Sequence, residues 1–550
     1  MKTRGKIPIT IGIVGHLDAI TTDDHKVQIM KIFTDLASAC PNSPLYFFSS
    51  LAEGADRFVA QIFLDFRNSR AEYNKCRLIV PTPLENEEYK NDFDNESDRE
   101  YNHLLNQADQ KFCAACEGGK KEREDHYLET GKFIADSSLI LLAMWDGKPG
   151  KKGGTADIVN YKKYGEPGNI GKSTFEYEGS VSIIPCRRKN CPEDESLADN
   201  DSLSLANVLK DTSIKETLEK IEEINSDTGH FNGPDDSITD NLLIDHPADL
   251  NLSQKSVLDW FNVLDSSSLR FHRRYMNTIK SLFILGFLTV VSLAVYTNLW
   301  LDRRVLALSV FLIASASAIY IISRRTNDHG KYLYTRTLAE ALRIQFYWSL
   351  SGIRINVSDH ILRIHRKEFT WIEHLLSSLY GASYHDEKPA AESAWVLLEN
   401  WVRNQCLFFD KAIKRMTAEQ RKFTIMSNIC LVAGCSLLIS IFFLEEFYVS
   451  GNYMNTLQVI ITSLLSFFAL MRAYIEMKGY NQLLKQYELM NILYGKAEVK
   501  LKEILGLTGD TEMKEKYLRE LFTIIGKEAL IENGNWYLIL KEKEPGIEGI

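Results

Sequence analysis

The sequence predicts an α/β domain, in which helices cover both faces of a parallel sheet, followed by an all-α membrane region with four transmembrane helices and long cytoplasmic helices. Short apolar segments alternate with helical segments over residues 7–186, which is the pattern of a parallel sheet with crossover helices. Four apolar runs without charged residues lie in the second half of the chain, and runs of this kind are typical of membrane spans. With 550 residues, the chain is long enough for more than one domain.

Apolar segments of strand length mark the α/β part. A helix is expected over residues 23–39 and another after Asp56, whereas the polar stretch 85–127 is expected to hold one long helix and a charged loop. The third strand should stop at Pro81, because proline removes a ladder donor. Five strands are expected, at residues 8–14, 45–49, 77–80, 138–145 and 181–184.

Three of these strands end in small or acidic residues. In an open α/β sheet, ligands bind outside the carboxyl ends of the strands, so the three loops should converge on one crevice. The alternatives are that His16 only caps a backbone carbonyl and that Trp145 belongs to the core. The predicted ligand-binding residues are Gly15, His16, Ser50, Glu53, Gly54, Asp56, Trp145, Asp146, Gly153, Gly154, Thr155 and Asp157.

The glycine-rich turn 147–155 predicts the kind of ligand. It follows an apolar strand and leads into a segment that begins like a helix at Thr155. The first amides of a helix are unpaired, and together with the helix dipole they favour phosphate. We therefore expect a nucleotide-like ligand. The sequence contains no Walker motif, and the spacing of its residues assigns no catalytic grouping.

The residues of these loops resemble a known family. The resemblance to a SLOG domain, from the superfamily of the LOG nucleotide phosphoribohydrolases, rests on four spaced motifs: residues 14–16, 50–56, 81–84 with 88–93, and 145–147 with 153–157. It covers about the first third of the chain. The resemblance implies a Rossmann-like fold and the binding of a nucleotide or a nucleotide-derived second messenger.

The sequence departs from that family at two positions. A LOG hydrolase would carry a glutamate three residues after Thr155, where this chain has Ile158. Related sensors often carry an arginine after the histidine, where this chain has Leu17, and a bidentate phosphate ligand is lost with that arginine. A sensor is therefore favoured over an enzyme, with a membrane-tethered nucleotide N-glycosidase or phosphoribohydrolase as the alternative.

Composition narrows the function further. The net charge of −9 and the isoelectric point near 5.8 argue against a nucleic-acid partner. The nine cysteines form an odd number, and Met1 leads directly into a strand-like segment without a secretory signal, so reduced cytosolic thiols are expected. Cys113 and Cys116 could form half of a zinc site with Cys186 and Cys191, but that second spacing is loose, so we expect no metal.

The four apolar runs are expected to form two membrane hairpins: residues 281–299 with 305–323, and 423–444 with 457–470. The fourth run is short for a span and must use flanking residues. Lysines and arginines concentrate before the first run and after the second run of each hairpin, at 270–280, 324–331, 411–422 and 472–478. The positive-inside rule therefore places the N- and C-termini in the cytoplasm. The protein is expected to be a multi-pass protein of the inner membrane.

The spans carry small and hydroxylated residues instead of charges. Such residues let membrane helices approach closely, either within one subunit or between subunits of a homo-oligomer that forms a pore. The absence of charges from the spans argues against a proton pump. The residues concerned are Thr289, Ser292, Ser315, Ser317, Gly434, Ser436, Ser440, Thr462, Ser463 and Ser466.

A similar amphipathic helix follows each hairpin, which forms a weak internal repeat: residues 334–348 and 474–487. Residues 339–343, 395–405 and 526–536 resemble SLATT-like proteins. That resemblance implies a membrane-perturbing effector of bacterial antiviral defence, with a signal-producing enzyme encoded nearby as a further partner. A nucleotide-gated ion channel is the alternative. A helix and a short strand, 536–541, are expected at the C-terminus.

The expected domain organisation follows from these assignments. Acidic and polar clusters between the sheet and the first hairpin predict an exposed connector with one helical stretch near 214–224. The expected divisions are a nucleotide-binding domain, a connector, a first hairpin with flanking helices, a cytoplasmic helical region, a second hairpin and a C-terminal helical region, at 1–186, 187–253, 254–352, 353–422, 423–472 and 473–550.

Overall fold

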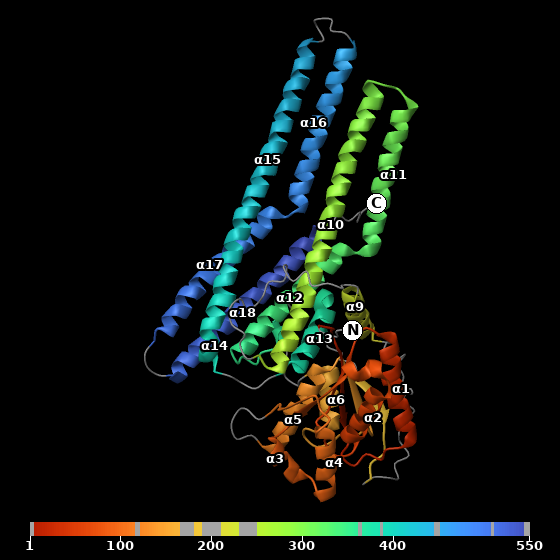
Figure 1. Ribbon diagram of the computed structural model, residues 1–550, viewed down its shortest axis with the longest axis vertical. Coiled ribbons are helices and arrows are strands. Elements are labelled where there is room, and N and C mark those ends of the chain that lie inside the picture. Colours follow the sequence, from red (N-terminus) through yellow and green to blue (C-terminus); the bar gives the residue numbers. More distant parts are fainter. Residues whose placement is uncertain are drawn as a thin grey trace. The chain divides into compact units, whose positions relative to one another are not determined.

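The computed structural model (Figure 1) describes residues 5–115, 122–165, 181–189, 211–229, 250–360, 366–384, 389–444, 451–507 and 511–543. The chain forms two compact units. The first, which we call the α/β unit, comprises Met1–Ile238, Pro247–Val263 and Ala341–Pro389. The second, which we call the helical unit, comprises Thr239–His246, Leu264–Glu340 and Ala390–Ile550.

The parallel sheet of the α/β unit is confirmed. Its six described strands have the order β4-β3-β2-β1-β5-β6, and all neighbouring pairs are parallel. After β1 the chain builds the sheet outward in one direction, and it then returns to the other side of β1 to add β5 and β6. The strands are β1 (Ile9–Gly15), β2 (Leu45–Phe48), β3 (Arg77–Thr82), β4 (Gln110–Cys113), β5 (Ile140–Trp145) and β6 (Val181–Pro185).

Helices cover both faces of this sheet. Successive strand residues point to opposite faces, and a Cβ at Gly12 would meet Ile134 of α5, whereas a Cβ at Gly15 would meet Ala55 of α2. The helices α2 and α5 therefore lie on opposite sides of β1. The described helices that accompany the strands are α1 (Asp23–Ala39), α2 (Ala55–Ser69), α3 (Asn86–Tyr89), α4 (Asn95–Leu105), α5 (Arg123–Ser137) and α6 (Thr155–Tyr164).

Aromatic side chains form the core between α1, α2 and the sheet. Phe33 of α1 lies edge-to-face with Phe47 of β2, with ring centroids 5.7 Å apart, and Phe63 of α2 stacks on Phe47 at 5.0 Å. All three side chains are fully buried. Burial of one such ring stabilises a fold by about 1.5–3 kcal/mol, and aromatic pairs add about 0.5–1.5 kcal/mol. This core packs α1 and α2 against β2.

Residues 85–115 differ from the prediction. In place of one long helix, they form two short helices and the edge strand β4. The sequence of β4, Gln-Lys-Phe-Cys, has no apolar run, because an edge strand is only half covered and Lys111 is exposed. The strand β3 continues through Pro81 instead of stopping there. The pairing with β2 ends at Ile79, so Pro81 pairs with β4 alone and has no β2 partner that would need its missing amide.

The predicted connector is also partly wrong. Its helix, α9 (Thr212–Gly229), belongs to the α/β unit and is not exposed on its apolar side, where Ile221 and Ile224 are buried. The buried amide of Asn225 donates to the carbonyl oxygen of Ile7 at 2.8 Å, and its oxygen accepts from the amide of Ile7 at 2.9 Å. An acidic helix can thus still bury an apolar stripe.

Distant residues complete the α/β unit. The helix α13 (Arg366–Ala382) packs so closely on α5 that a Cβ at Gly381 would overlap Ser137. Tyr384 stacks near Phe112 and Phe133, with ring centroids 4.6 and 4.9 Å apart. The short helix η3 (Val357–His360) lies in the same region. The first domain therefore does not end at residue 186.

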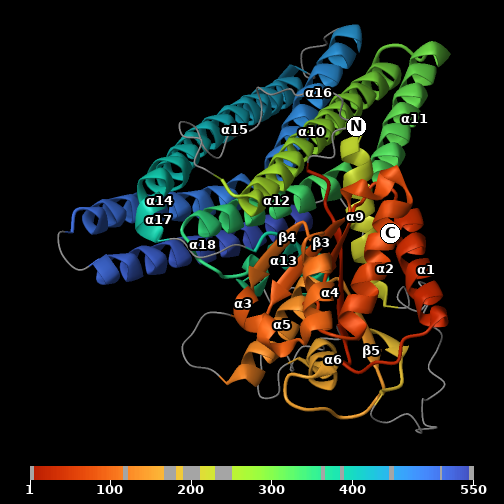
Figure 2. The same ribbon diagram turned by 60° about the horizontal axis from the view of Figure 1, so that its bottom comes forward.

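The helical unit contains the four predicted apolar helices, each long and apolar enough to cross a membrane. They form two hairpins, α10 with α11 and α15 with α16, whose helices run side by side in both views (Figures 1 and 2). Phe287 of α10 packs edge-to-face on Phe467 of α16 at 5.6 Å, which joins the hairpins. The bounds are α10 (Leu252–Asn298), α11 (Arg303–Thr326), α15 (Asn404–Leu444) and α16 (Gly451–Met477).

The weak sequence repeat has a structural counterpart. A residue with left-handed backbone follows the second helix of each hairpin, Asn327 at φ 50° and Gly479 at φ 61°. A new helix begins directly afterwards, α12 (Asp328–Leu350) or α17 (Tyr480–Leu505). Glycine and asparagine are the residues that adopt this conformation most readily, so each hairpin ends in a built-in change of helix direction.

The remaining helices close the helical unit. A π-helical turn, η5 (Leu398–Arg403), joins α14 (Ala390–Leu397) to α15. The last described helix, α18 (Thr511–Glu542), runs without interruption through residues 536–541. The predicted C-terminal strand is therefore wrong. Trp536 is buried in a cluster with Leu333 and Leu483, and this tertiary burial outweighs the strand-like apolar character of the segment.

Candidate ligand site at the carboxyl edge of the sheet

His16 and Asp146 meet where the order of the strands reverses. His16 follows β1, and Asp146 follows the neighbouring strand β5. The Nε2 atom of His16 lies 3.0 Å from the Oδ1 atom of Asp146, and only 10% and 13% of the two side chains are exposed. In open α/β sheets, ligands bind at the carboxyl edge of this switch point. The structure therefore brings two predicted site residues together at the expected place.

The environment of Asp146 keeps its carboxylate charged. Burial alone would raise the pKa of this side chain, but hydrogen bonds from the amide of Lys148 and from His16, with the charge of Arg188, lower the pKa overall. The amide of Lys148 donates to Oδ1 at 3.1 Å. An ionised carboxylate beside an imidazole can accept hydrogen bonds from a ligand and hold the orientation of the histidine ring.

Arg188 supplies a guanidinium that sequence reasoning missed. It follows β6 and donates through Nε to the Oδ1 atom of Asp18 at 2.8 Å. The amide of Ile20 also donates to the carbonyl of Arg187, which ties this segment to the loop after β1. The sequence lacks an arginine directly after His16, but the fold brings one to the same loop from a distant position. Sequence spacing gave no signal for it.

The loops after β1 and β2 pack tightly on each other. Gly54 has a φ of +76°, and a Cβ there would lie 2.7 Å from the carbonyl oxygen of His16 and would overlap the carbonyl of Leu17. The amide of Ala55 donates to the carbonyl of His16 at 3.2 Å. Only glycine fits this position without strain. Gly15, His16 and Gly54 are thus brought together.

Asp56 is a buried acid at the start of α2. Only 4% of it is exposed, and its Oδ2 atom accepts a hydrogen bond from the hydroxyl of Ser50 at 2.9 Å. Burial raises the pKa of Asp56 to about 7. The intervening Leu51 has a φ of 54°, an uncommon conformation for a leucine, and such strain often accompanies functional sites. Ser50 and Asp56 therefore form one polar pair.

Arg57 is a second residue that the sequence did not single out. Its side chain is 2% exposed and donates through Nε to the carbonyl of Leu51 and through Nη1 to Ser97. Among the residues that the structure describes, its buried Nη2 atom has no hydrogen-bond partner. The carboxylate of Glu53 accepts from the same Ser97 hydroxyl. The predicted Glu53 is thus held in a network around a buried cation.

An amide of the glycine-rich turn is already hydrogen-bonded to a side chain of the same segment. The amide of Gly153 donates to the Oδ2 atom of Asp157 at 3.0 Å, so that this carboxylate lies where we expected a phosphate. A Cβ at Gly153 would lie 3.0 Å from the carbonyl of Glu124 in α5. The first half of the turn is tied to β5 instead, because the indole of Trp145 donates to the carbonyl of Lys148 at 2.9 Å.

The positions of Gly154 and Thr155 follow from this arrangement. Gly154 precedes α6 and donates through its amide to the carbonyl of Lys151 at 2.9 Å, while Thr155 is the first residue of α6 and is buried. The described hydrogen bonds of residues 153–157 stay within the turn and α6. The structure therefore unites the first two loops with Asp146 and holds the second half of the turn separately against α5.

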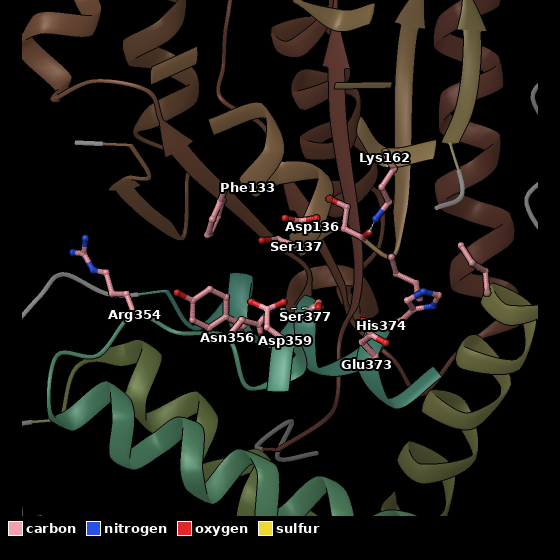
Figure 3. Close-up of a pocket in the computed structure, with 14 residues that line it drawn as sticks. Phe133, Asp136, Ser137, Lys162, Arg354, Asn356, Asp359, Glu373, His374 and Ser377 are labelled. Carbon is pink, nitrogen blue, oxygen red and sulfur yellow. Dashed lines mark hydrogen bonds between the residues drawn. The ribbon is translucent and has the colours of Figure 1, made fainter. Parts of the chain in front are cut away.

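A cavity of about 200 Å³ lies at the opposite edge of the sheet (Figure 3). Asp136 and Ser137, at the end of α5, face Asn356 and Asp359 across it. The buried ammonium of Lys162 donates to the carbonyls of Ala135 and Ser138 at 2.6 and 2.9 Å. The lining also includes Glu373 and the basic side chains of Arg354 and His374. None of the residues predicted to bind the ligand lines this cavity.

The cysteines differ in part from the expectation. Cys113 is disulfide-bonded, which is not the reduced thiol that we expected and leaves no thiolate for a zinc ion, while Cys116 and Cys191 lie outside the described residues. Cys186 is free and buried, and burial raises its pKa to about 12. Within the described part of the chain, no cluster of three or more histidine, cysteine, aspartate or glutamate side chains is suited to a metal.

In comparisons with known proteins, no protein-family model matches the chain, and no curated protein matches it either.

Proposed function

We propose that this protein is a sensor–effector of the inner membrane with both termini in the cytoplasm. A nucleotide-derived signal binds the SLOG-like α/β unit at its carboxyl edge. Binding drives the four-helix transmembrane region of an oligomer to form a pore or to disrupt the bilayer, as expected of a system of antiphage defence. The observation that carries the proposal is the His16–Asp146 pair at the reversal of strand order.

Electrostatics around the pair are compatible with a phosphorylated ligand that also carries hydrogen-bond donors. Arg188 and His16 offer donors, and the charged carboxylate of Asp146 is an acceptor of the kind that binds ribose hydroxyls or base amines. The carboxylate of Asp157 already occupies the Gly153 amide. A ligand phosphate is therefore expected at the loops after β1 and β2, beside Arg188, unless it displaces Asp157.

Two helices, α10 and α12, each have residues in both units. The helix α10 begins in the α/β unit, which includes residues up to Val263, and continues as the first membrane-span candidate. The helix α12 returns from the first hairpin and enters the α/β unit at Ala341. A ligand drives such a change only if it binds the resting and active states with unequal affinity. Two shared helices allow a small change in one unit to alter the other.

The proposal is tested by the small molecules that the full-length protein retains. Wild type and two variants, His16→Ala and the control His103→Ala, are purified in detergent and denatured, and released compounds are identified by mass spectrometry. His103 is exposed on α4 and hydrogen-bonds only Gln107 of its own helix region. A nucleotide-type compound should accompany wild type and His103→Ala and fall about tenfold or more in His16→Ala. Equal retention by all three proteins would place the ligand elsewhere.

Asp56 supports a second candidate, the membrane-tethered nucleotide hydrolase. A carboxyl group with a pKa near 7 is suited to general acid–base catalysis. Wild type and Asp56→Asn, purified in the same way and incubated with nucleotides, decide between the candidates. Release of free base that is lost in Asp56→Asn identifies an enzyme, whereas unchanged nucleotide indicates a sensor. Ligand-dependent ion flux into liposomes, without leakage of larger dyes, would instead identify a gated channel.

A further inference from the structure

A second cavity lies inside the helical unit, just below the apolar segments. It measures about 350 Å³ and is lined by residues of α10, α12, α15, α17, α18 and the turn after α16. Its charged lining is mostly basic, with one carboxylate: His272, His329, Arg415, Lys478, Lys543 and Glu419. Of the two left-handed residues, Gly479 lies between the lining residues Lys478 and Tyr480 in the sequence, and Asn327 precedes the lining residue His329 by two positions. The two hairpins therefore share this cavity at their ends.

Lys478 has a charge that the fold does not neutralise locally. Its Nζ atom contacts the sulfur of Met276 at 3.4 Å and lies 5.7 Å from the ring centre of Tyr474. Within the described chain, it forms no ion pair with a carboxylate, and neither does Arg415. Burial, together with Lys280 and Arg415, lowers the pKa of Lys478 in spite of the opposing charge of Glu419. An anion in the cavity would balance the positive charges of Lys478 and Arg415.

The histidine side chains add hydrogen-bonding groups to the cavity, and the basic residues around His272 lower its pKa. The ring of His272 stacks near Tyr332 at 4.5 Å, and its buried Nδ1 atom has no hydrogen-bond partner among the described residues. Burial and the charges of Lys478, His329, Arg415 and Arg336 lower the pKa of His272 to about 4. Its ring is therefore neutral at pH 7 and can donate to an anion.

The walls of the cavity are aromatic. Tyr332 lies between His272 and Trp536, whose ring centroid is 5.5 Å away, and Tyr275 stacks on His329 at 4.3 Å. The hydroxyl of Tyr480 donates to Glu419 at 3.1 Å and thereby engages the one carboxylate of the lining. Aromatic surfaces beside cations are found where a ligand has both a charged and an apolar part.

The depth of the cavity fits the membrane boundary. Lys478 follows the apolar run that ends at Leu470 by eight residues, and Arg415 precedes the run that begins at Phe423 by eight. At the helical rise of about 1.5 Å per residue, both lie roughly 12 Å beyond the apolar segments. Basic pockets between membrane helices on the cytoplasmic side bind anionic headgroups.

We propose that this cavity binds a phosphate group through Lys478, Arg415 and His272, supplied either by the headgroup of an anionic phospholipid or by a soluble phosphorylated molecule. Because residues of both hairpins line the cavity, the bound phosphate links them. This site is independent of the carboxyl edge of the α/β unit, and substitution of His16 should leave it unchanged.

The test measures phosphate binding to full-length protein in a phosphate-free detergent by native mass spectrometry. The variants are Lys478→Gln and Arg415→Gln, and the control is Lys485→Gln, which removes the same charge from an exposed position of α17. Arg415 lines the cavity and is itself exposed, so its variant is expected to keep the fold. Both cavity variants should bind about tenfold less than wild type and the control, as expected for one lost charge-assisted hydrogen bond.

Two ligands distinguish the sources of the phosphate. Dioctanoyl phosphatidylglycerol and glycerol phosphate are titrated separately, with dioctanoylglycerol as the uncharged reference. Binding of the lipid alone assigns a headgroup, and binding of both assigns a soluble phosphate. Equal binding by the cavity variants and Lys485→Gln, or no binding beyond that of dioctanoylglycerol, overturns the proposal. Loss of nucleotide retention in His16→Ala with intact binding here would separate the two sites.

Discussion

At the scale of single residues, the pKa values of two carboxyl groups near the carboxyl edge are shifted in opposite directions. Hydrogen bonds and neighbouring cations lower the pKa of Asp146 in spite of its burial, whereas burial of Asp56 dominates and raises its pKa to about 7. Both are aspartates that follow a strand in the sequence, and their spacing alone does not distinguish them. Pairs of acids with separated pKa values are typical of functional sites.

Asp56 should make stability depend on pH. The folded pKa of about 7 lies above the ordinary 3.8, so the folded state retains a proton that the unfolded state loses between these values. The protonated Asp56 contributes its full amount to the free energy of unfolding below about pH 4. This contribution, on the order of 2–4 kcal/mol, is lost as the pH rises to about 7. Asp56→Asn should therefore melt at a higher temperature than wild type at pH 8, with a smaller difference at pH 5.

The control for this measurement is Asp65→Asn, because the side chain of Asp65 lies on the same helix and is 40% exposed, with an ion pair to Lys26 at 3.4 Å and a hydrogen bond from the side-chain amide of Gln61 at 3.0 Å. Thermal unfolding of the three full-length proteins in detergent, followed between pH 5 and 8, gives the comparison. A melting curve of Asp56→Asn that stays parallel to wild type across this range would show that Asp56 is ionised in the folded protein.

At the scale of elements, close approach of helices defines each hairpin. A Cβ at Gly434 of α15 would lie 2.9 Å from the Cδ2 atom of Leu465 in α16, whereas a Cβ at Gly286 of α10 would meet no atom within 4 Å. In the other hairpin, the hydroxyl of Ser309 donates to Ser292 at 2.8 Å across the interface. Ser436, Ser440 and other predicted contact residues bond carbonyls of their own helix instead.

The two glycines form a matched pair for a test of hairpin packing. Gly434→Val should lower the melting temperature of the protein in detergent, because overpacking costs about 1–3 kcal/mol. Gly286→Val makes the same change of residue type in an apolar helix and should have little effect. Equal destabilisation by both would mean that helix propensity, and not the approach of α15 to α16, limits the stability of the hairpin.

At the scale of the whole molecule, the chain alternates between its two units. Residues 341–389 return to the α/β unit after the first hairpin, and Asn225 of the predicted connector hydrogen-bonds Ile7, just before β1. Deletion of residues 1–186 would therefore remove the residues against which α9 and α13 pack. Experiments that separate the roles of the two units therefore need point substitutions instead of deletions.

The orientation of the whole chain is open to a direct test. Lysines and arginines lie before the first helix and after the second helix of each hairpin, and the sequence 445–450 contains Glu445 and Glu446 but no lysine or arginine. Both ends of the chain are therefore predicted in the cytoplasm. A fluorescent protein fused after residue 550 should fluoresce, and alkaline phosphatase inserted at Trp300 should be active. An active phosphatase at the C-terminus would reverse the topology.

The sequence by itself determined the elements whose signals are local. Apolar runs gave the parallel strands and the four long apolar helices, because burial on both faces and in lipid each demand uninterrupted apolar residues. The strands that carry His16 and Asp146 were predictable for this reason. The edge strand β4, with Lys111 exposed, was not, since a half-covered strand needs no apolar run.

Only the tertiary structure decided which side chains meet. In the folded chain, Arg188 bonds Asp18 in the loop after β1, and the carboxylate of Asp157 accepts a hydrogen bond from the Gly153 amide. Buried Arg57 and the carboxylate of Glu53 bond the same Ser97 hydroxyl. The tertiary structure also gathered Lys478 and Arg415 around one cavity. These contacts join residues that are distant in the chain or that compete for one partner, and their energies depend on burial and distance. A linear pattern contains neither quantity, so only the folded chain specifies them.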